Sequence, residues 1–135
     1  MTFAPSNFLR RVLQLDAAAT GATGLLLLGG TSLLHGLLNL PVSLMIYSGL
    51  FCVGWAAVLG AASIRERLSR GFVWSIIAGN VVWVIGSVAL LLSGYVSPTW
   101  LGYAFVIAQA LAVDIFAGLQ MFAMWKYEKR TNVTA

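Results

Sequence analysis

Two long stretches of this sequence, residues 12–64 and 71–125, contain no lysine or arginine and only one acidic residue each, Asp16 and Asp114. A helix needs about 20 apolar residues to cross the hydrocarbon core of a bilayer. Each stretch is therefore long enough for two crossings and the turn between them. Only 9% of the residues are charged, whereas a soluble globular domain has roughly 25%. The pattern predicts an all-α membrane protein, a four-transmembrane-helix bundle built from two antiparallel helical hairpins.

Turn signals divide each stretch, and Pro41 and Pro98 indicate where the returning helices begin, because proline is favoured in the first turn of a helix. We expect a single transmembrane domain over residues 1–135, with spans at about 14–35, 41–63, 72–93 and 99–125. Residues 1–13 are expected to form an interfacial helix, and residues 126–135 a short cytoplasmic tail.

The basic residues predict the orientation of the bundle. With the spans placed as above, all of them fall on one side of the membrane, and by the positive-inside rule that side is the cytoplasm. We therefore expect a multi-pass protein of the bacterial inner (cytoplasmic) membrane with both termini inside. The net charge of +4 then serves orientation and contact with anionic lipid headgroups and gives no reason to expect nucleic acid. The residues concerned are Arg10, Arg11, Arg65, Arg67, Arg70, Lys126, Lys129 and Arg130.

Several polar or amphipathic side chains fall inside the predicted spans and are the candidate site residues. Counting 1.5 Å of rise per residue from the nearest basic residue places Asp16 and Gln120 in a shallow layer. The same count places Asn80 and Asp114 together in a deeper layer, with the indole of a tryptophan, and we expect these two side chains to pair. The full set is Asp114, Asn80, Asp16, Gln120, Gln109, Trp55 and Trp83.

Asp114 allows two interpretations. An ionised carboxylate at the bilayer centre costs about 2.5–3.5 kcal/mol on the insertion scale, and no basic residue of this chain reaches its level. Asp114 either binds a proton or a cation in a transport cycle, or it is a structural hydrogen-bonding residue worth about 1 kcal/mol. Small residues recur at helical spacing in each span and suit either packing within the bundle or contact between copies of the chain.

The sequence contains no recognisable catalytic or cofactor motif. The single histidine, His35, falls at a turn, and a bound haem would need a further axial ligand from a partner chain or a methionine. The single cysteine, Cys52, lies mid-span and has no CxxC or Cys/His cluster around it. No phosphate-binding glycine loop is present. We expect no enzymatic activity, no metal and no cofactor.

Several short motifs support a resemblance that extends over nearly the whole length. They are Leu15-Asp16-Ala17 with Gly21 and Gly24, Ala78-Gly79-Asn80 with Trp83 and Ser87, Pro98-Thr99 with Gly102, and Gln109-Ala110 with Gln120. On these residues the chain resembles a class of small, uncharacterised bacterial inner-membrane proteins with four predicted spans. The resemblance implies the four-span fold and carries no catalytic role, and Asp114 lies outside the residues that support it.

Two functions follow as expectations. The first is an integral inner-membrane accessory, structural or assembly protein without catalytic activity, whose partners are the lipid bilayer and either a second copy of the chain or a larger membrane complex. The alternative is a small proton-coupled carrier or channel that works as an oligomer through the Asp114/Asn80 pair.

Overall fold

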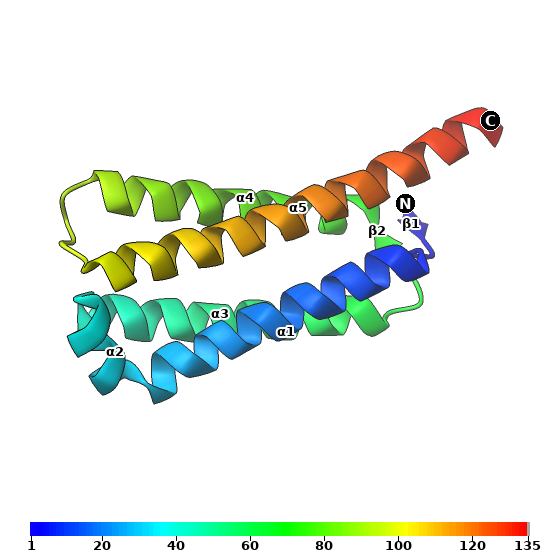
Figure 1. The fold of residues 1–135 in the computed structure, drawn as a ribbon. Helices are drawn as coiled ribbons and strands as arrows, with labels where there is room; N and C mark the ends of the chain where they lie inside the picture. Colours follow the sequence, from blue (N-terminus) through cyan, green and yellow to red (C-terminus); the bar gives the residue numbers. More distant parts are fainter. Residues whose placement is uncertain (135) are drawn as a thin grey trace.

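A computed structural model describes residues 1–134 and is almost entirely helical (Figure 1). Four of its helices are long and apolar enough to cross a membrane, which supports a multi-pass membrane protein and a helical bundle. The elements in chain order are β1 (Thr2–Phe3), α1 (Asn7–Gly29), α2 (Thr31–Leu38), α3 (Val42–Ile64), β2 (Leu68–Ser69), α4 (Arg70–Leu92) and α5 (Trp100–Thr134).

The first helix differs most from its predicted bounds. It begins at Asn7, where the Ser6 hydroxyl caps it by accepting a hydrogen bond from the Leu9 amide at 3.1 Å. Residues 7–13 are therefore the first turns of α1, and no separate interfacial helix precedes the span. The helix is interrupted at Gly30, and the short helix α2 follows. Helix α2 ends at Leu38, and its C-cap Asn39 adopts the left-handed conformation (φ 51°) that asparagine tolerates better than most residues.

The N-terminus, the end of α5 and the α3–α4 connection lie at one end of the bundle (Figure 1). We call it the charged end because all the basic residues belong to these segments. At this end β1 pairs antiparallel with β2. The Arg67 guanidinium donates to the carbonyl of Thr2 at 2.9 Å, and the ring of Phe3 stacks on Tyr127 with centroids 4.4 Å apart. The amino-terminal segment thus joins the α3–α4 connection to α5.

Helices α1 and α3 make the most extensive contact in the bundle, and α4 packs mainly on α5. Two glycines allow the close approach of α1 and α3. A Cβ atom added to Gly24 would lie 2.9 Å from the Gly49 carbonyl oxygen, which is too short for an ordinary contact. This is the packing that small residues permit between helices in lipid. In contrast, Gly86 and Gly118 have no neighbour there within 4 Å.

Hydrogen bonds also join the elements at the opposite end. The Asn39 side chain donates to the Ser97 carbonyl at 2.6 Å, and the Thr99 hydroxyl donates to the Leu37 carbonyl at 2.6 Å. His35 Nδ1 lies 2.7 Å from the Leu40 carbonyl oxygen, so this histidine belongs to the same turn. These bonds hold the α2–α3 turn against the α4–α5 loop.

Candidate functional site

A closed hydrogen-bond network lies inside the bundle and is centred on Asp16. Oxygen Oδ2 of Asp16 accepts from Asn80 Nδ2 at 2.9 Å and from Gln120 Nε2 at 2.7 Å. Oxygen Oδ1 accepts from the Thr20 hydroxyl at 3.1 Å. Asp16 and Gln120 are completely buried, and Asn80 is 3% exposed.

The second N–H and the carbonyl oxygen of the Asn80 amide also form hydrogen bonds in the network. Its second amide hydrogen reaches Gln120 Oε1 at 3.2 Å, and its carbonyl oxygen accepts from the Trp55 indole nitrogen at 3.0 Å. The network therefore contains a side chain from each of the four long helices. Within residues 1–134 no buried side-chain polar atom lacks a partner, and such complete satisfaction is what makes a buried polar network stabilising.

The buried face of α5 explains why Gln120 belongs to this network and Asp114 does not. The inward positions Val106, Ala110, Ala117, Gln120 and Met124 follow the alternating steps of four and three residues that a helix packed along a neighbour requires. Between Ala110 and Ala117, steps of three and then four residues place position 113 on the inward face. Asp114 is one residue out of step and lies on the exposed face.

Asp114 therefore does not form the predicted pair with Asn80, whose amide is taken up by Asp16, Gln120 and Trp55. The two predicted layers are also wrong for Asn80, which was placed deeper than Asp16 and Gln120 but is hydrogen-bonded to both. Counting residues along a helix gives no information on which face a side chain occupies. Asp114 instead lies in a groove of about 200 Å³ on the outer side of α4 and α5. The groove is lined by Val84, Ser87, Val88, Leu91, Val106, Ile107, Ala110, Leu111 and Asp114.

A second polar cluster joins α4 to α5 farther from the charged end. Trp83 Nε1 donates to Gln109 Oε1 at 2.7 Å, and Gln109 Nε2 donates to the Ser87 hydroxyl at 3.0 Å and to the Val106 carbonyl at 2.9 Å. The Ser87 hydroxyl in turn donates to the Trp83 carbonyl at 2.8 Å. The sequence singled out Trp83 and Gln109 without predicting that they bind each other.

An aromatic ladder lies beside both polar clusters. The ring of Phe51 lies 5.8 Å from Trp55 and 5.3 Å from Trp83 between centroids, with interplanar angles of 14° and 5°. Phe51 was not among the candidates from the sequence. Its position one helical turn before Trp55 is the signal that would have found it, because residues i and i+4 share a helix face.

A cleft of about 390 Å³ separates the α1–α3 pair from the α4–α5 pair in the half of the bundle remote from the charged end. A smaller cavity of about 40 Å³ adjoins Trp55 and Asn80. The two cavities share the lining residues Thr23, Phe51, Gly79, Trp83 and Gln109. A cavity needs about 10–15 Å³ of such space to hold one water, so the smaller cavity has room for water beside the buried network.

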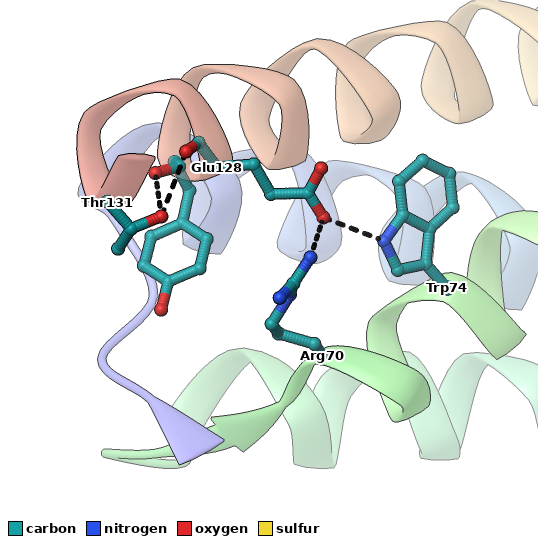
Figure 2. A network of polar contacts seen from close by, with 5 residues as sticks. Arg70, Trp74, Glu128 and Thr131 are labelled. Carbon is teal, nitrogen blue, oxygen red and sulfur yellow. Dashed lines mark hydrogen bonds and ion pairs between the residues drawn. The ribbon is translucent and has the colours of Figure 1, made fainter. Parts of the chain in front are cut away.

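Most of the basic side chains are exposed at the charged end, and two more of them, besides Arg67, bind across it. Arg10 donates to the Ser63 carbonyl at 3.0 Å. Arg70 forms an ion pair with Glu128, and Trp74 also donates to that carboxylate (Figure 2). The hydrogen bond from Arg70 holds the pKa of Glu128 below its ordinary value. The remaining basic residues are Arg11, Arg65, Lys126, Lys129 and Arg130.

Within residues 1–134 no group of three or more His, Cys, Asp or Glu side chains is placed to hold a metal ion. No protein-family model, curated protein or solved structure matches the chain.

Proposed function

We propose that this chain is an accessory or assembly protein of the bacterial inner membrane, with both termini in the cytoplasm, that docks sideways on another membrane protein through the Asp114 groove. The observation that carries the proposal is the exposed carboxyl of Asp114 in the middle of an apolar span. Counting from Lys126 at 1.5 Å per residue, it lies roughly 18 Å from the charged end.

The energetic argument concerns what surrounds that carboxyl. A charged or strongly polar group facing hydrocarbon is unfavourable by about 2.5–3.5 kcal/mol, and no Lys or Arg of this chain lies at that depth. A transmembrane helix with a basic or amide side chain at the same level would satisfy Asp114. Ser87 and Ala110 in the groove are small enough for such a helix to approach closely.

The hydrogen-bond network inside the bundle also supports a role for Asp114 in binding a partner. Asp16, Asn80 and Gln120 satisfy one another, so the fold has no need of Asp114. The orientation rests on the basic residues, which all gather at one end and are expected to contact anionic headgroups in the cytoplasmic leaflet.

The test is photo-cross-linking in native membranes. A photoactivatable phenylalanine analogue is placed at Leu111, which lines the groove, and at Leu50 on α3 as the matched control. Leu111 and Leu50 are 57% and 56% exposed, and each lies fifteen residues from a basic residue, Lys126 and Arg65 respectively. Both variants are then repeated with Asp114→Leu and Asp114→Asn.

The proposal expects one discrete cross-linked protein from position 111 and none from position 50. Asp114→Leu should abolish it, and Asp114→Asn should retain part of it because an amide still forms hydrogen bonds. Two epitope tags show whether the captured protein is a second copy of the chain, which would replace the accessory role with self-association. Equal capture at both positions, or capture that persists in Asp114→Leu, contradicts the proposal.

A proton-coupled carrier or channel is the second candidate, and one observation favours it. The cavity beside Asn80 brings water-sized space next to the amide that binds Asp16. Such a path would use Asp16 and Asn80, with Asp114 outside it. In proteoliposomes this alternative requires a proton flux that Asp16→Asn abolishes and Asp114→Asn preserves; absence of flux from the parent protein rejects it.

A further inference from the structure

The cleft between the two helix pairs has the size and lining of a small-molecule site. Its volume of about 390 Å³ falls within the 300–1,000 Å³ that is usual for ligand pockets. Its walls are mostly aliphatic and aromatic, and no charged side chain lines it. A bound molecule must therefore be neutral and largely apolar.

The cleft opens toward the bilayer between α3 and α4. Val82 on α4 lines it and is 67% exposed, and Phe51 on α3 lines it and is 49% exposed. Side chains bridge these two helices, since Phe51 stacks on Trp83 across the gap. A molecule dissolved in the membrane can enter at this side, and an apolar tail can remain in the lipid.

Aromatic rings from α3 and α4 line the cleft near its opening. Phe51 and Trp83 both line it and lie nearly parallel, at 5° between ring planes. Offset stacking with another ring is the favoured contact of such surfaces. A planar ring of a ligand can pack against this aromatic pair.

Several polar groups of the cleft keep free lone pairs after their own hydrogen bonds are made, and the Ser48 hydroxyl also lines the cleft. The hydrogens of Trp83 Nε1, of the Gln109 amide and of the Ser87 hydroxyl are all committed within the α4–α5 cluster, and the Thr23 hydroxyl donates to the Ala19 carbonyl. Lone pairs remain on the carbonyl oxygen of Gln109 and on the hydroxyl oxygens of Ser87 and Thr23. A ligand hydroxyl can donate to them.

We propose that this cleft binds a neutral membrane-soluble molecule with a flat hydroxyl-bearing ring, of the quinol type, whose ring stacks beside Trp83 and Phe51 and whose hydroxyl donates to the Gln109 side of the cleft. The assignment stands on the cleft alone and is independent of the docking role of Asp114, which lines a different surface.

The ligand test uses a tritiated benzoquinol with a short alkyl tail, kept reduced under anaerobic conditions. Binding to the protein in nanodiscs is measured by scintillation proximity against empty nanodiscs. The dimethyl ether of the same quinol is the matched competitor, because it keeps the ring and tail but cannot donate. We expect saturable binding of the quinol and about tenfold weaker competition by the ether, the effect of one lost hydrogen bond.

The protein test fills the cleft without disturbing the packing. Gly86 lines the cleft and a Cβ added there meets nothing within 4 Å, so Gly86→Leu occupies the ligand volume. Gly54→Leu on α3 is the control, because it also faces open space but does not line the cleft. Ser48→Leu blocks the cleft from α3 and provides a second filling variant should Gly86→Leu fail to fold.

The filling variants should lose at least about tenfold in quinol affinity, equivalent to one ligand hydrogen bond or more, whereas Gly54→Leu should bind as the parent does. Quinol binding that stays unchanged in both filling variants overturns the proposal. The proposal is also overturned if the ether competes as well as the quinol does. It is overturned as well if a phospholipid chain occupies the cleft and the quinol does not displace it.

Discussion

The two aspartates inside the spans of this protein have the same chemistry and opposite surroundings. Asp16 on α1 is completely buried and accepts hydrogen bonds from Asn80, Gln120 and Thr20. Asp114 on α5 faces outward into a shallow groove. The first is a part of the fold, and the second is exposed on its surface, where we propose that a partner satisfies it. An intramembrane carboxylate is therefore informative only when its helix face is known.

The largest expected difference between the two sites is in stability. Asp16→Leu leaves the buried donors of Asn80, Gln120 and Thr20 without an acceptor and should lower the free energy of unfolding by roughly 2–3 kcal/mol. Asp114→Leu should leave it unchanged within about 0.5 kcal/mol, as is usual for exposed substitutions. Unfolding of the purified protein in mixed micelles, followed by circular dichroism, measures both.

Equal destabilisation by the two variants would contradict the comparison, since it would mean that Asp114 also supports the isolated fold. Asp16→Asn is the informative intermediate. It preserves the shape of the side chain but replaces one acceptor oxygen with a donor that faces other donors. Its stability should fall between those of the parent and Asp16→Leu.

The contrast between inward and outward faces also predicts the behaviour of two glycines. Gly24→Ala places a methyl group 2.9 Å from the Gly49 carbonyl oxygen, so α1 and α3 must separate, at about 2 kcal/mol, the middle of the range for overpacked cores. Gly54→Ala meets nothing within 4 Å and should be neutral or stabilising by about 0.5 kcal/mol, since alanine is the better helix former. The same unfolding assay distinguishes them, and similar losses would show that α1 and α3 do not pack through Gly24.

Charge patterning predicted α3 and α4 closely because the bilayer imposes their length, but it missed the bounds of α1 and the length of α5, which continues to Thr134 through the predicted tail. The span expected at about 41–63 is Val42–Ile64, and that expected at about 72–93 is Arg70–Leu92. The break at Gly30 and the β1–β2 pair were not predicted. A two-residue strand has no periodicity to recognise, and a single glycine pair does not distinguish a helix break from a packing site.

The site was predicted in its members and only partly in its pairings: Asp16 binds Gln120, with which it was grouped, but Asn80 binds these two and not Asp114. Asp16, Asn80, Gln120 and Trp55 were all candidates, and the indole bond from Trp55 to Asn80 is the one deep-layer contact that proved correct. Counting residues from the basic clusters put Asn80 in a deeper layer than the two side chains that it binds. The rotation of each helix is set by packing against its neighbours and cannot be counted at all. The heptad spacing on α5 contains that information, and it favours position 113 over Asp114.

A smaller effect is expected from the indole that joins α3 to the Asp16 network. Trp55→Phe keeps most of the ring volume but removes the donor to Asn80 Oδ1, which should lower the free energy of unfolding by about 1 kcal/mol. Trp125→Phe is the control, because Trp125 is 56% exposed. If the Asn80 amide finds water in the adjoining cavity, the loss shrinks toward zero, which would favour the water-accessible path of the carrier alternative.

The smallest expected effect concerns a third carboxylate, Glu128, which lies at the charged end and has a basic partner. Arg70 holds the pKa of Glu128 below its ordinary value of 4.5 by hydrogen bonding to it. A carboxylate whose pKa is lowered in the folded state stabilises the fold above its unfolded-state pKa, and this contribution is lost as the pH falls through the folded-state pKa. The pair is partly exposed, because the side chains of Arg70 and Glu128 are 48% and 30% accessible. It should therefore contribute only about 0.5 kcal/mol to the free energy of unfolding.

The measurement compares the parent with Glu128→Gln from pH 7 down to pH 3. The parent should have a slightly higher free energy of unfolding than Glu128→Gln at pH 7. This difference between the two proteins should disappear as the pH falls below the ordinary range of a glutamate. Raising the salt concentration at pH 7 should narrow the same difference, because exposed charges are screened. A difference that persists at pH 3 would mean that Glu128 acts through packing or through its bond to Trp74. Among the three carboxylates, then, only the one with a basic partner in this chain should show its stabilising role as a dependence on both pH and salt.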